Sequence, residues 1–189
     1  MEKGFTLIEL LVVIAIVAIL SVVVILTLNP AELLRQARDS NRVSDMSVLK
    51  HALGIYLADV RSPVLANGST YTCYVSAATT TGANCAGAFS ATFAATSATT
   101  TRKTDGTGWM PVNFGLISSG SPIAQLPIDP TNDATTYYYA YAANTSTLGF
   151  EINANMESAR YTNGGPGDVE SKDGGNNANR YEVGTDLTF

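Results

Sequence analysis

The chain begins with an apolar run that is unlike the rest of the sequence. Leu10 to Leu28 carries no charged residue, and its only polar side chains are Ser21 and Thr27. This run of 19 residues approaches the ~20 that a helix needs to cross a bilayer. It is longer than the apolar core of a cleaved secretory signal, roughly 7–15 residues, and no small-residue cleavage site follows it. The pattern therefore predicts a membrane-spanning helix.

A second helix is predicted directly after the apolar run. Asn29 is a favourable N-cap, Pro30 suits the first helical position, and Glu32 lies three residues after the cap. We therefore expect a kink or short break at Asn29 and Pro30 rather than a loop. Arg35 and Asp39 stand four residues apart and are expected to pair weakly. Apolar residues then recur at helical spacing, namely Leu49, Ala52, Leu53, Tyr56, Leu57 and Val60.

After Pro63 the helical pattern ends and the composition becomes that of strands and turns. Residues 70–75 are rich in Tyr, Thr and Val. Alternating side chains in 137–141 and 150–156, separated by a turn at Asn144, predict an antiparallel hairpin. We expect one face of the sheet to pack on the second helix, with Trp109, Val112 and Phe114 in the same core. The Ala/Thr-rich residues 76–107 are interpreted as a surface loop with little to pack.

The charge is low and unevenly placed. Only 14% of residues are charged and the net charge is −5. Residues 29–104 carry net +3, whereas residues 105–189 carry net −7. The asymmetry is either solvated surface or a means for neighbouring copies to meet with opposite charge. The acidic balance argues against phosphate-dominated nucleic-acid binding, and a single histidine, His51, argues against a zinc centre or a His-dependent triad. No set of residues predicts an enzyme.

Two pairs of residues after Pro63 are candidates for a disulfide and for a metal site. Cys73 and Cys85 are the only cysteines; in an exported segment we expect them to form a disulfide, with free buried thiols as the alternative. Residues 161–180 are rich in Gly, Asn and acids, a composition that suits Ca²⁺. Asp168 and Asp173 are the candidate calcium ligands, with a solvated turn as the alternative.

One acid, Glu9, stands at the edge of the apolar run. A carboxylate costs about 2.5–3.5 kcal/mol at the centre of a membrane helix and less near the interface. Glu9 is therefore either a functional group that needs a partner or a carboxylate in the headgroup region.

The residues around Glu9 resemble a known processing motif. Gly4-Phe5-Thr6-Leu7-Ile8-Glu9-Leu10-Leu11 is similar to the motif of type IV pilins and type II secretion pseudopilins. The resemblance implies that a prepilin peptidase removes Met1–Gly4 by cutting between Gly4 and Phe5, and then methylates the new amino group of Phe5. It also implies that Glu9 of one subunit pairs with Phe5 of a neighbour during assembly.

The order of segments in the head supports a looser resemblance. Leu126–Pro130, the tyrosine run and Asp173-Gly174-Gly175 follow one another as in the C-terminal half of the major pseudopilins of type II secretion. That group binds calcium in its C-terminal loop, which is the second reason to name Ca²⁺ as a candidate ligand.

Together these features predict an α+β pilin fold, with a long protruding N-terminal helix packed on a small antiparallel sheet. The expected parts are a leader (1–4), a transmembrane and filament-core helix (5–28), an amphipathic stem (29–62) and an exported head (63–189). If the chain is helical from Phe5 to Ala58, this element is about 80 Å long at ~1.5 Å per residue, too long for a compact domain.

The predicted function is that of a structural subunit in a type IV pilus-like filament for adhesion, motility or DNA uptake. The alternatives are a major pseudopilin forming a secretion piston and a membrane-tethered binding module that never polymerises. The expected partners are other copies of the chain, prepilin peptidase, an assembly ATPase and a platform protein. The chain would lie in the cytoplasmic membrane with its N-terminus inside, and later in an extracellular pilus or an envelope pseudopilus.

Overall fold

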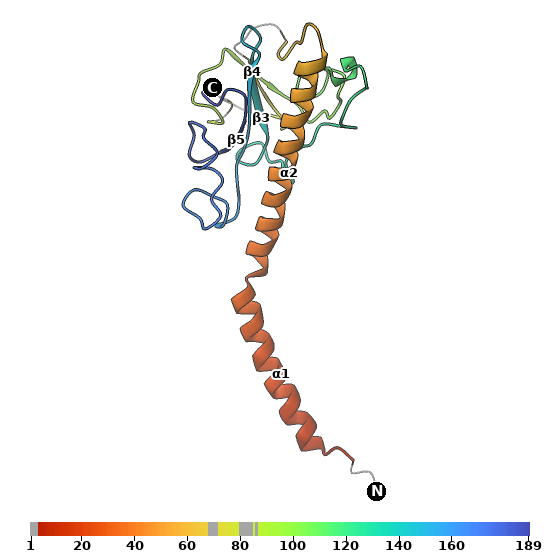
Figure 1. Ribbon diagram of the computed structural model, residues 1–189. Coiled ribbons are helices and arrows are strands. Elements are labelled where there is room, and N and C mark those ends of the chain that lie inside the picture. The colour runs from red at the N-terminus through yellow and green to blue at the C-terminus, as the bar shows by residue number, and fades with distance from the viewer. Residues whose placement is uncertain (1–3, 68–71, 80–84, 86) are drawn as a thin grey trace.

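The computed structural model describes residues 4–67, 72–79, 85 and 87–189. Residues 1–3 of the predicted leader, residues 70 and 71 of the first predicted strand, and part of the Ala/Thr-rich segment lie outside this range. Two helices form a long stalk that carries a head at one end (Figure 1). The elements are, in order, α1 (Leu7–Leu28), α2 (Pro30–Asp59), β1 (Thr72–Val75), β2 (Ala95–Ala98), the 3₁₀ turn η1 (Phe114–Leu116), β3 (Ala140–Asn144), β4 (Gly149–Ala154) and β5 (Tyr181–Gly184).

Helix α1 is apolar on every side and makes no core with the head. It is long and apolar enough, by length and composition, to cross a membrane over Leu7–Ile25, with a mean hydropathy of 3.2 and none of the segment buried. A helix that is hydrophobic all round must be covered by lipid or by other protein. The described chain does not cover α1, so lipid or another protein must do so.

The two helices meet at Asn29. Its backbone is left-handed (φ 40°, ψ 73°), so it ends α1, and its side chain accepts a hydrogen bond from the Glu32 amide at 3.4 Å, so it also caps α2. Pro30 occupies the first turn of α2. The stalk thus bends between α1 and α2, at Asn29 and Pro30, where the sequence predicted a kink (Figure 1). Helix α2 ends at Asp59, three residues before the predicted limit of the stem.

The sheet has the strand order β2-β1-β3-β4-β5. The predicted hairpin is present as β3 and β4, paired from Ala140 opposite Asn153 to Asn144 opposite Gly149. The pairs β1–β3 and β4–β5 are antiparallel as well. One edge differs from the fully antiparallel expectation, because β2 runs parallel to β1. The fold is an α+β pilin-like fold with a mostly antiparallel sheet.

One face of the sheet packs on α2. Met46, Leu49, Leu53 and Tyr56 are buried on the inner side of the helix. Alternate residues of β3 and β4 complete this core, namely Tyr141, Phe150, Ile152 and Ala154. The segment before β3 adds Tyr139 and the three residues expected there, Trp109, Val112 and Phe114.

The other face of the sheet carries a second hydrophobic core. Phe89 and Phe93 are buried there with Cys73, Val75 and Tyr138. The interpretation of residues 76–107 as a loop with little to pack is therefore wrong. This segment supplies two phenylalanines and the edge strand β2. The small Ala, Thr and Ser side chains of β2 can form a strand there because β1 offers free hydrogen-bonding groups.

Candidate functional site: the N-terminal segment and the junction of α2 with the head

The predicted cleavage point is accessible. Gly4 and Phe5 precede the first helical residue, and the Phe5 side chain is 78% exposed. A Cβ added to Gly4 would meet no atom within 4 Å. The peptide bond between these residues therefore lies in open, non-helical backbone, which is the conformation that a peptidase can bind.

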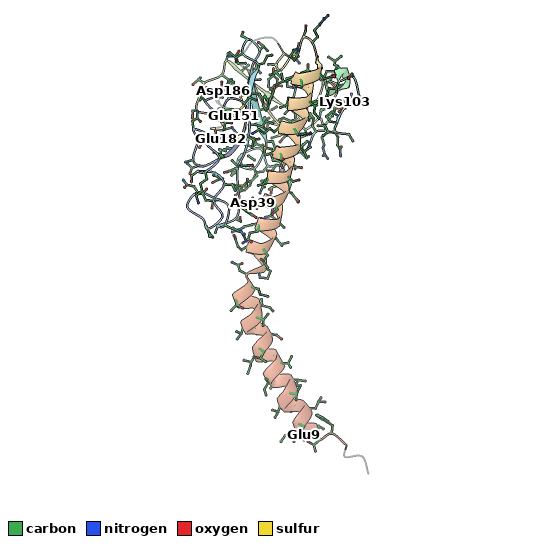
Figure 2. The ribbon with its side chains drawn as sticks, viewed as in Figure 1. Glu9, Asp39, Lys103, Glu151, Glu182 and Asp186 are labelled. Carbon is green, nitrogen blue, oxygen red and sulfur yellow. A yellow bond between two sulfur atoms is a disulfide. The ribbon has the colours of Figure 1, made fainter. Side chains whose placement is uncertain are left out.

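Thr6 and Glu9 form a reciprocal cap at the start of α1. The Glu9 carboxylate oxygen Oε2 accepts hydrogen bonds from the Thr6 amide at 2.9 Å and from the Thr6 hydroxyl at 2.6 Å. The Thr6 hydroxyl accepts in turn from the Glu9 amide at 3.3 Å. This capping box turns the carboxylate back toward the N-terminus. Glu9 thus lies at the free end of α1, at the opposite end of the stalk from the head (Figure 2).

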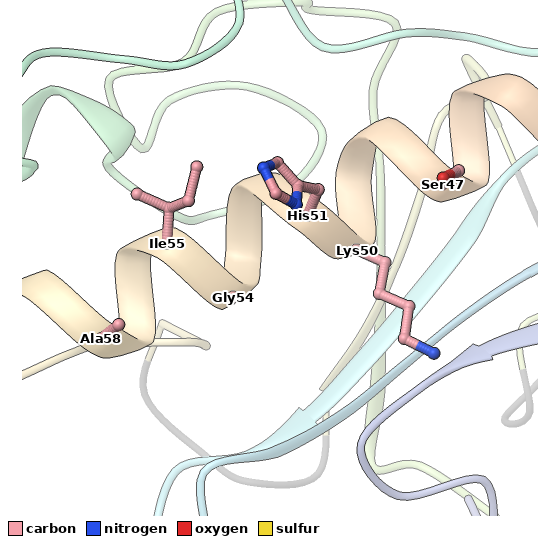
Figure 3. A pocket seen from close by; sticks show the side chains of 6 residues that line it. All are labelled: Ser47, Lys50, His51, Gly54, Ile55 and Ala58. Carbon is pink, nitrogen blue, oxygen red and sulfur yellow. The ribbon is translucent and has the colours of Figure 1, made fainter.

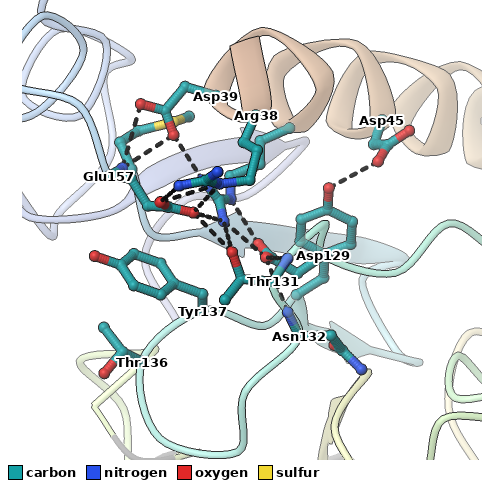
Figure 4. A network of polar contacts seen from close by, with 12 residues as sticks. Arg38, Asp39, Asp45, Asp129, Thr131, Asn132, Thr136, Tyr137 and Glu157 are labelled. Atoms are coloured by element: carbon teal, nitrogen blue, oxygen red, sulfur yellow. Dashed lines mark hydrogen bonds and ion pairs between the residues drawn. The ribbon is translucent and has the colours of Figure 1, made fainter. Parts of the chain in front are cut away.

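A buried ionic network joins α2 to the head (Figure 4). Its centre is Arg42, whose side chain is completely buried. The guanidinium donates to both carboxylate oxygens of Asp129 at 2.6 and 2.7 Å, to Asp39 at 2.7 Å and to Glu157 at 2.6 Å. Its carbon Cζ also lies 5.0 Å from the centre of the Tyr137 ring. Arg42 therefore ties α2 to two separate loops of the head.

The neighbours of Arg42 extend this network. Arg38 pairs with Glu157, and the Thr131 hydroxyl donates to Glu157 at 2.8 Å. Asp39 accepts from the backbone amides of Glu157 at 3.0 Å and Ser158 at 2.8 Å. Every carboxylate of the network thus has donors, which offsets part of the desolvation cost of burying ions.

The electrostatics of the junction favour the charged forms. The hydrogen bond from Arg38 is the largest of the effects that lower the pKa of Glu157 to about 2. Burial by itself would lower the pKa of Arg42, but the bonds to Asp129 and the other carboxylates raise it above its ordinary value. One turn further along α2, burial raises the pKa of Asp45, which accepts from the Tyr139 hydroxyl at 2.7 Å.

The expected pair of Arg35 with Asp39 is not formed. Asp39 instead pairs with Arg42, and Arg35 approaches Glu32 at 3.8 Å. Asp39 is buried against the head, whereas Arg35 lies on the exposed side of the helix. Sequence reasoning missed the junction, because Asp129 and Glu157 are distant in the chain and resemble surface acids.

Cys73 and Cys85 form the expected disulfide, and both are buried. The bridge links β1 to the segment that covers the second face of the sheet, so it closes that core.

The structure does not join the two candidate calcium ligands into a metal site. Asp168 accepts hydrogen bonds from the Gly164 amide and from the amide and hydroxyl of Ser171. Asp173 accepts from the Gly175 and Glu182 amides. Among the described residues there is no group of three or more His, Cys, Asp or Glu side chains arranged to hold a metal ion. The two carboxylates close turns, and we assign no role to calcium.

His51 lies on the exposed side of α2. It lines a shallow hollow together with Ser47, Lys50, Gly54, Ile55 and Ala58 (Figure 3). In the described part of the chain, no hydrogen bond joins His51 to Ser47 or Lys50, so the hollow holds no assembled catalytic group.

Comparison with known proteins agrees with the N-terminal geometry. The family model described as the prokaryotic N-terminal methylation motif matches residues 1–25. No curated protein and no solved structure gives a significant match. Proteins with this motif are structural rather than enzymatic, and the apolar helix after it indicates membrane anchoring followed by a place in the cell envelope or a pilus. The chain therefore carries the N-terminal methylation motif that marks prepilin-peptidase substrates of the type IV pilin and pseudopilin family.

Proposed function

We propose that this protein is the structural subunit of a type IV pilus-like filament. It is cleaved between Gly4 and Phe5, methylated on Phe5 and polymerised through α1. The observation that carries this proposal is that every described apolar side chain of α1 is exposed. Such a helix can be covered by lipid in a bilayer or by identical helices in a bundle, so transfer between the two environments is feasible.

Cleavage would create the partner that Glu9 lacks. Removal of the leader leaves a free amino group on Phe5, four residues before Glu9. In the chain the Glu9 oxygen Oε2 is held by Thr6, while Oε1 receives no bond from the described residues. The amino group of a neighbouring subunit can pair with that carboxylate. Burial in an apolar bundle strengthens the attraction, but desolvation offsets much of it, so the pair contributes more to axial register than to stability.

Before assembly the subunit would lie in the cytoplasmic membrane, with its N-terminus inside and the head exported. Assembly then needs a prepilin peptidase, a platform protein and an ATPase, because the chain has no phosphate-binding loop of its own. A secretion pseudopilin is the alternative that the order of segments in the head favours. Surface fibres in sheared fractions would identify a pilus, whereas filaments confined to the envelope and loss of secretion on deletion would identify a pseudopilin.

Substitution of Glu9 tests the assembly role. In Glu9→Ala we expect normal membrane insertion and normal cleavage, but a filament yield reduced by tenfold or more, since ~1.4 kcal/mol per contact already corresponds to a factor of ten. Electron microscopy and immunoblotting of sheared fractions give the yield, and intact mass gives the processing state. Glu32→Ala, at the first turn of α2, is the matched control and should assemble normally.

Two results would contradict the proposal. Normal filaments from Glu9→Ala would remove the role of Glu9 in register. A wild-type chain that retains Met1, carries no methyl group and forms no fibres would instead favour a membrane-tethered binding module.

A further inference from the structure

A pair of acids is buried on the face of the sheet that points away from α2. Glu151 lies on β4 and Glu182 on β5, and their exposed fractions are 0% and 1%. Glu182 is directly opposite Asn153 in the register, and Glu151 and Asn153 alternate on the same face of β4. The three polar side chains therefore gather beneath the residues that cover this face, and both acids are labelled on the head in Figure 2.

The acids have too few donors for two full negative charges. Glu151 accepts from the Asn153 side-chain amide at 3.3 Å and from the Phe189 backbone amide at 3.2 Å. Glu182 accepts from the Asn177 amide at 3.0 Å through Oε2. Within the described part of the chain, Glu182 Oε1 and Asn153 Oδ1 are buried without any donor, and neither acid takes part in an ion pair with Lys, Arg or His.

The charged groups around the pair do not neutralise it. Asp173, in the loop before β5, accepts from the Glu182 amide at 2.6 Å and adds another negative charge. Asp186 follows β5 and lies against Gly149. Arg180 turns its guanidinium to the ring of Tyr138, 5.2 Å from the centroid. The covering segment 85–93 contains no charged residue.

We propose that Glu151 and Glu182 share a proton, and that this protonated carboxyl pair is a pH-sensitive latch which fastens the C-terminal part of the head to the sheet. Two carboxylates buried side by side on one face of the sheet cannot both ionise at low cost, so the pair keeps one proton. The shared proton also supplies the missing donor to Glu182.

Several segments converge on the latch. The Phe189 amide binds Glu151 and the Asn177 amide binds Glu182, while the Phe189 carbonyl accepts from the Ser90 amide at 2.9 Å. Gly175 packs so closely on Glu182 that an added Cβ would overlap its carboxylate. Loss of the proton would place two charges under these contacts and would loosen residues 173–177 and 185–189 together.

The titration behaviour agrees with this arrangement. Burial, followed by the hydrogen bond and the charge of Glu182, raises the pKa of Glu151 from 4.5 to about 9. Burial also raises the pKa of Glu182. A carboxyl group whose pKa is higher in the folded than in the unfolded chain stabilises the fold fully below the unfolded value, and that stabilisation is lost as the pH rises through the folded value. The latch should therefore hold at neutral pH and open at alkaline pH.

The test uses the full chain in detergent micelles. Carbon-13 chemical shifts of the Glu side-chain carboxyls should show one titration of this pair above pH 8. The melting temperature of the head should fall by about 5–10 °C between pH 7 and pH 9.5. In Glu151→Gln the amide replaces the shared proton as donor, so most of this slope should disappear, whereas Glu32→Gln should keep it.

Three results would overturn the latch. The first is titration of both carboxyls below pH 6, a measurement on the wild type that remains decisive if Glu151→Gln does not fold. The second is an unchanged pH slope in a folded Glu151→Gln. The third is a rise in melting temperature with Ca²⁺ or Mg²⁺ at pH 7.5 that Glu151→Gln abolishes, because a cation would then take the position of the shared proton between the two carboxyls.

Discussion

At the scale of single residues, one buried cation is the centre of the ionic contacts between α2 and the head. Arg42 contacts three carboxylates that come from α2 and from two loops of the head. A buried ion pair adds little net stability when it is intact, but removal of one partner leaves the others buried and uncompensated. The arrangement therefore fixes how the head sits on α2 more than it strengthens the fold.

Substitution of Arg42 should accordingly be severe. We expect Arg42→Met to lower the free energy of unfolding by about 3–5 kcal/mol, because three carboxylates lose their common partner. Denaturant titration followed by the fluorescence of buried Trp109 gives this value. Arg35→Met, at an exposed position of the same helix, should change it by less than about 0.5 kcal/mol. Equal effects of the two substitutions would contradict the role of Arg42 as the central cation.

Glu157 should make the head sensitive to acid. Its pKa is lowered to about 2, chiefly by Arg38, so its contribution to stability is complete above the unfolded value near 4.5 and is lost as the pH falls from there toward 2. Thermal unfolding between pH 5 and pH 2 measures this loss. Glu157→Gln should be less stable at pH 5 and should show a shallower decline, whereas a decline as steep as the wild type would assign the acid sensitivity to other groups.

The sequence was informative about local chemistry and uninformative about distant partners. The cap at Asn29 and the disulfide follow from residue type and spacing, and both are present. Arg42 lies 87 residues from Asp129 and 115 from Glu157, and no local rule connects groups so far apart. The expected weak pair of Arg35 with Asp39 is absent, because Asp39 pairs with Arg42 in the same helix and accepts from backbone amides of the head.

At the scale of elements, the bend at Asn29 depends on two separate features. The left-handed backbone of Asn29 ends α1, and Pro30 cannot donate the amide hydrogen bond that a continuous helix needs at that point. The strands were harder to anticipate. Alternation predicted the β3–β4 hairpin, whereas the parallel partner β2 is joined to β1 through the disulfide-bridged segment, whose Ala and Thr side chains resemble those of a loop.

Removal of both features should straighten the stalk. In Asn29→Ala/Pro30→Ala we expect one continuous helix, so that spin labels at Ala18 and Ser40 move apart toward about 33 Å, the rise of 22 residues at ~1.5 Å each. Pulsed electron spin resonance in bicelles measures this distance. Asn29→Gly alone should leave the bend in place, because glycine adopts the left-handed conformation freely. An unchanged distance in the double variant would show that the bend has another cause.

At the scale of the whole molecule, α1 stands apart from the two hydrophobic cores of the chain. The head and α2 supply both hydrophobic cores, while α1 has no buried residue among those described. Two of the cations in residues 29–104 are also paired within the chain, since Arg38 and Arg42 face carboxylates of their own head. Fewer cations of this region are therefore free to attract the acidic head of a neighbouring copy than the charge distribution suggested.

A chain that begins at Pro30 should therefore fold without detergent. We expect residues 30–189 to be monomeric, with a melting temperature within a few degrees of that of the full chain in micelles, because the deleted part contributes no core. Size-exclusion chromatography with light scattering and circular dichroism provide the measurements. Aggregation or loss of the near-ultraviolet signal would mean that α1 supports the head directly.

The one-sided attachment of the head has a mechanical consequence. The ion pairs between α2 and the head all involve the turn of α2 from Arg38 to Arg42. In the described part of the chain, none of them involves α1. In the proposed fibre of packed α1 helices, a pulling force along the axis would run through the helical core, and the heads would lie beside that path. Asn29 would then be the point where the helical core and the head can pivot, so the proposed fibre could stretch without unfolding its heads.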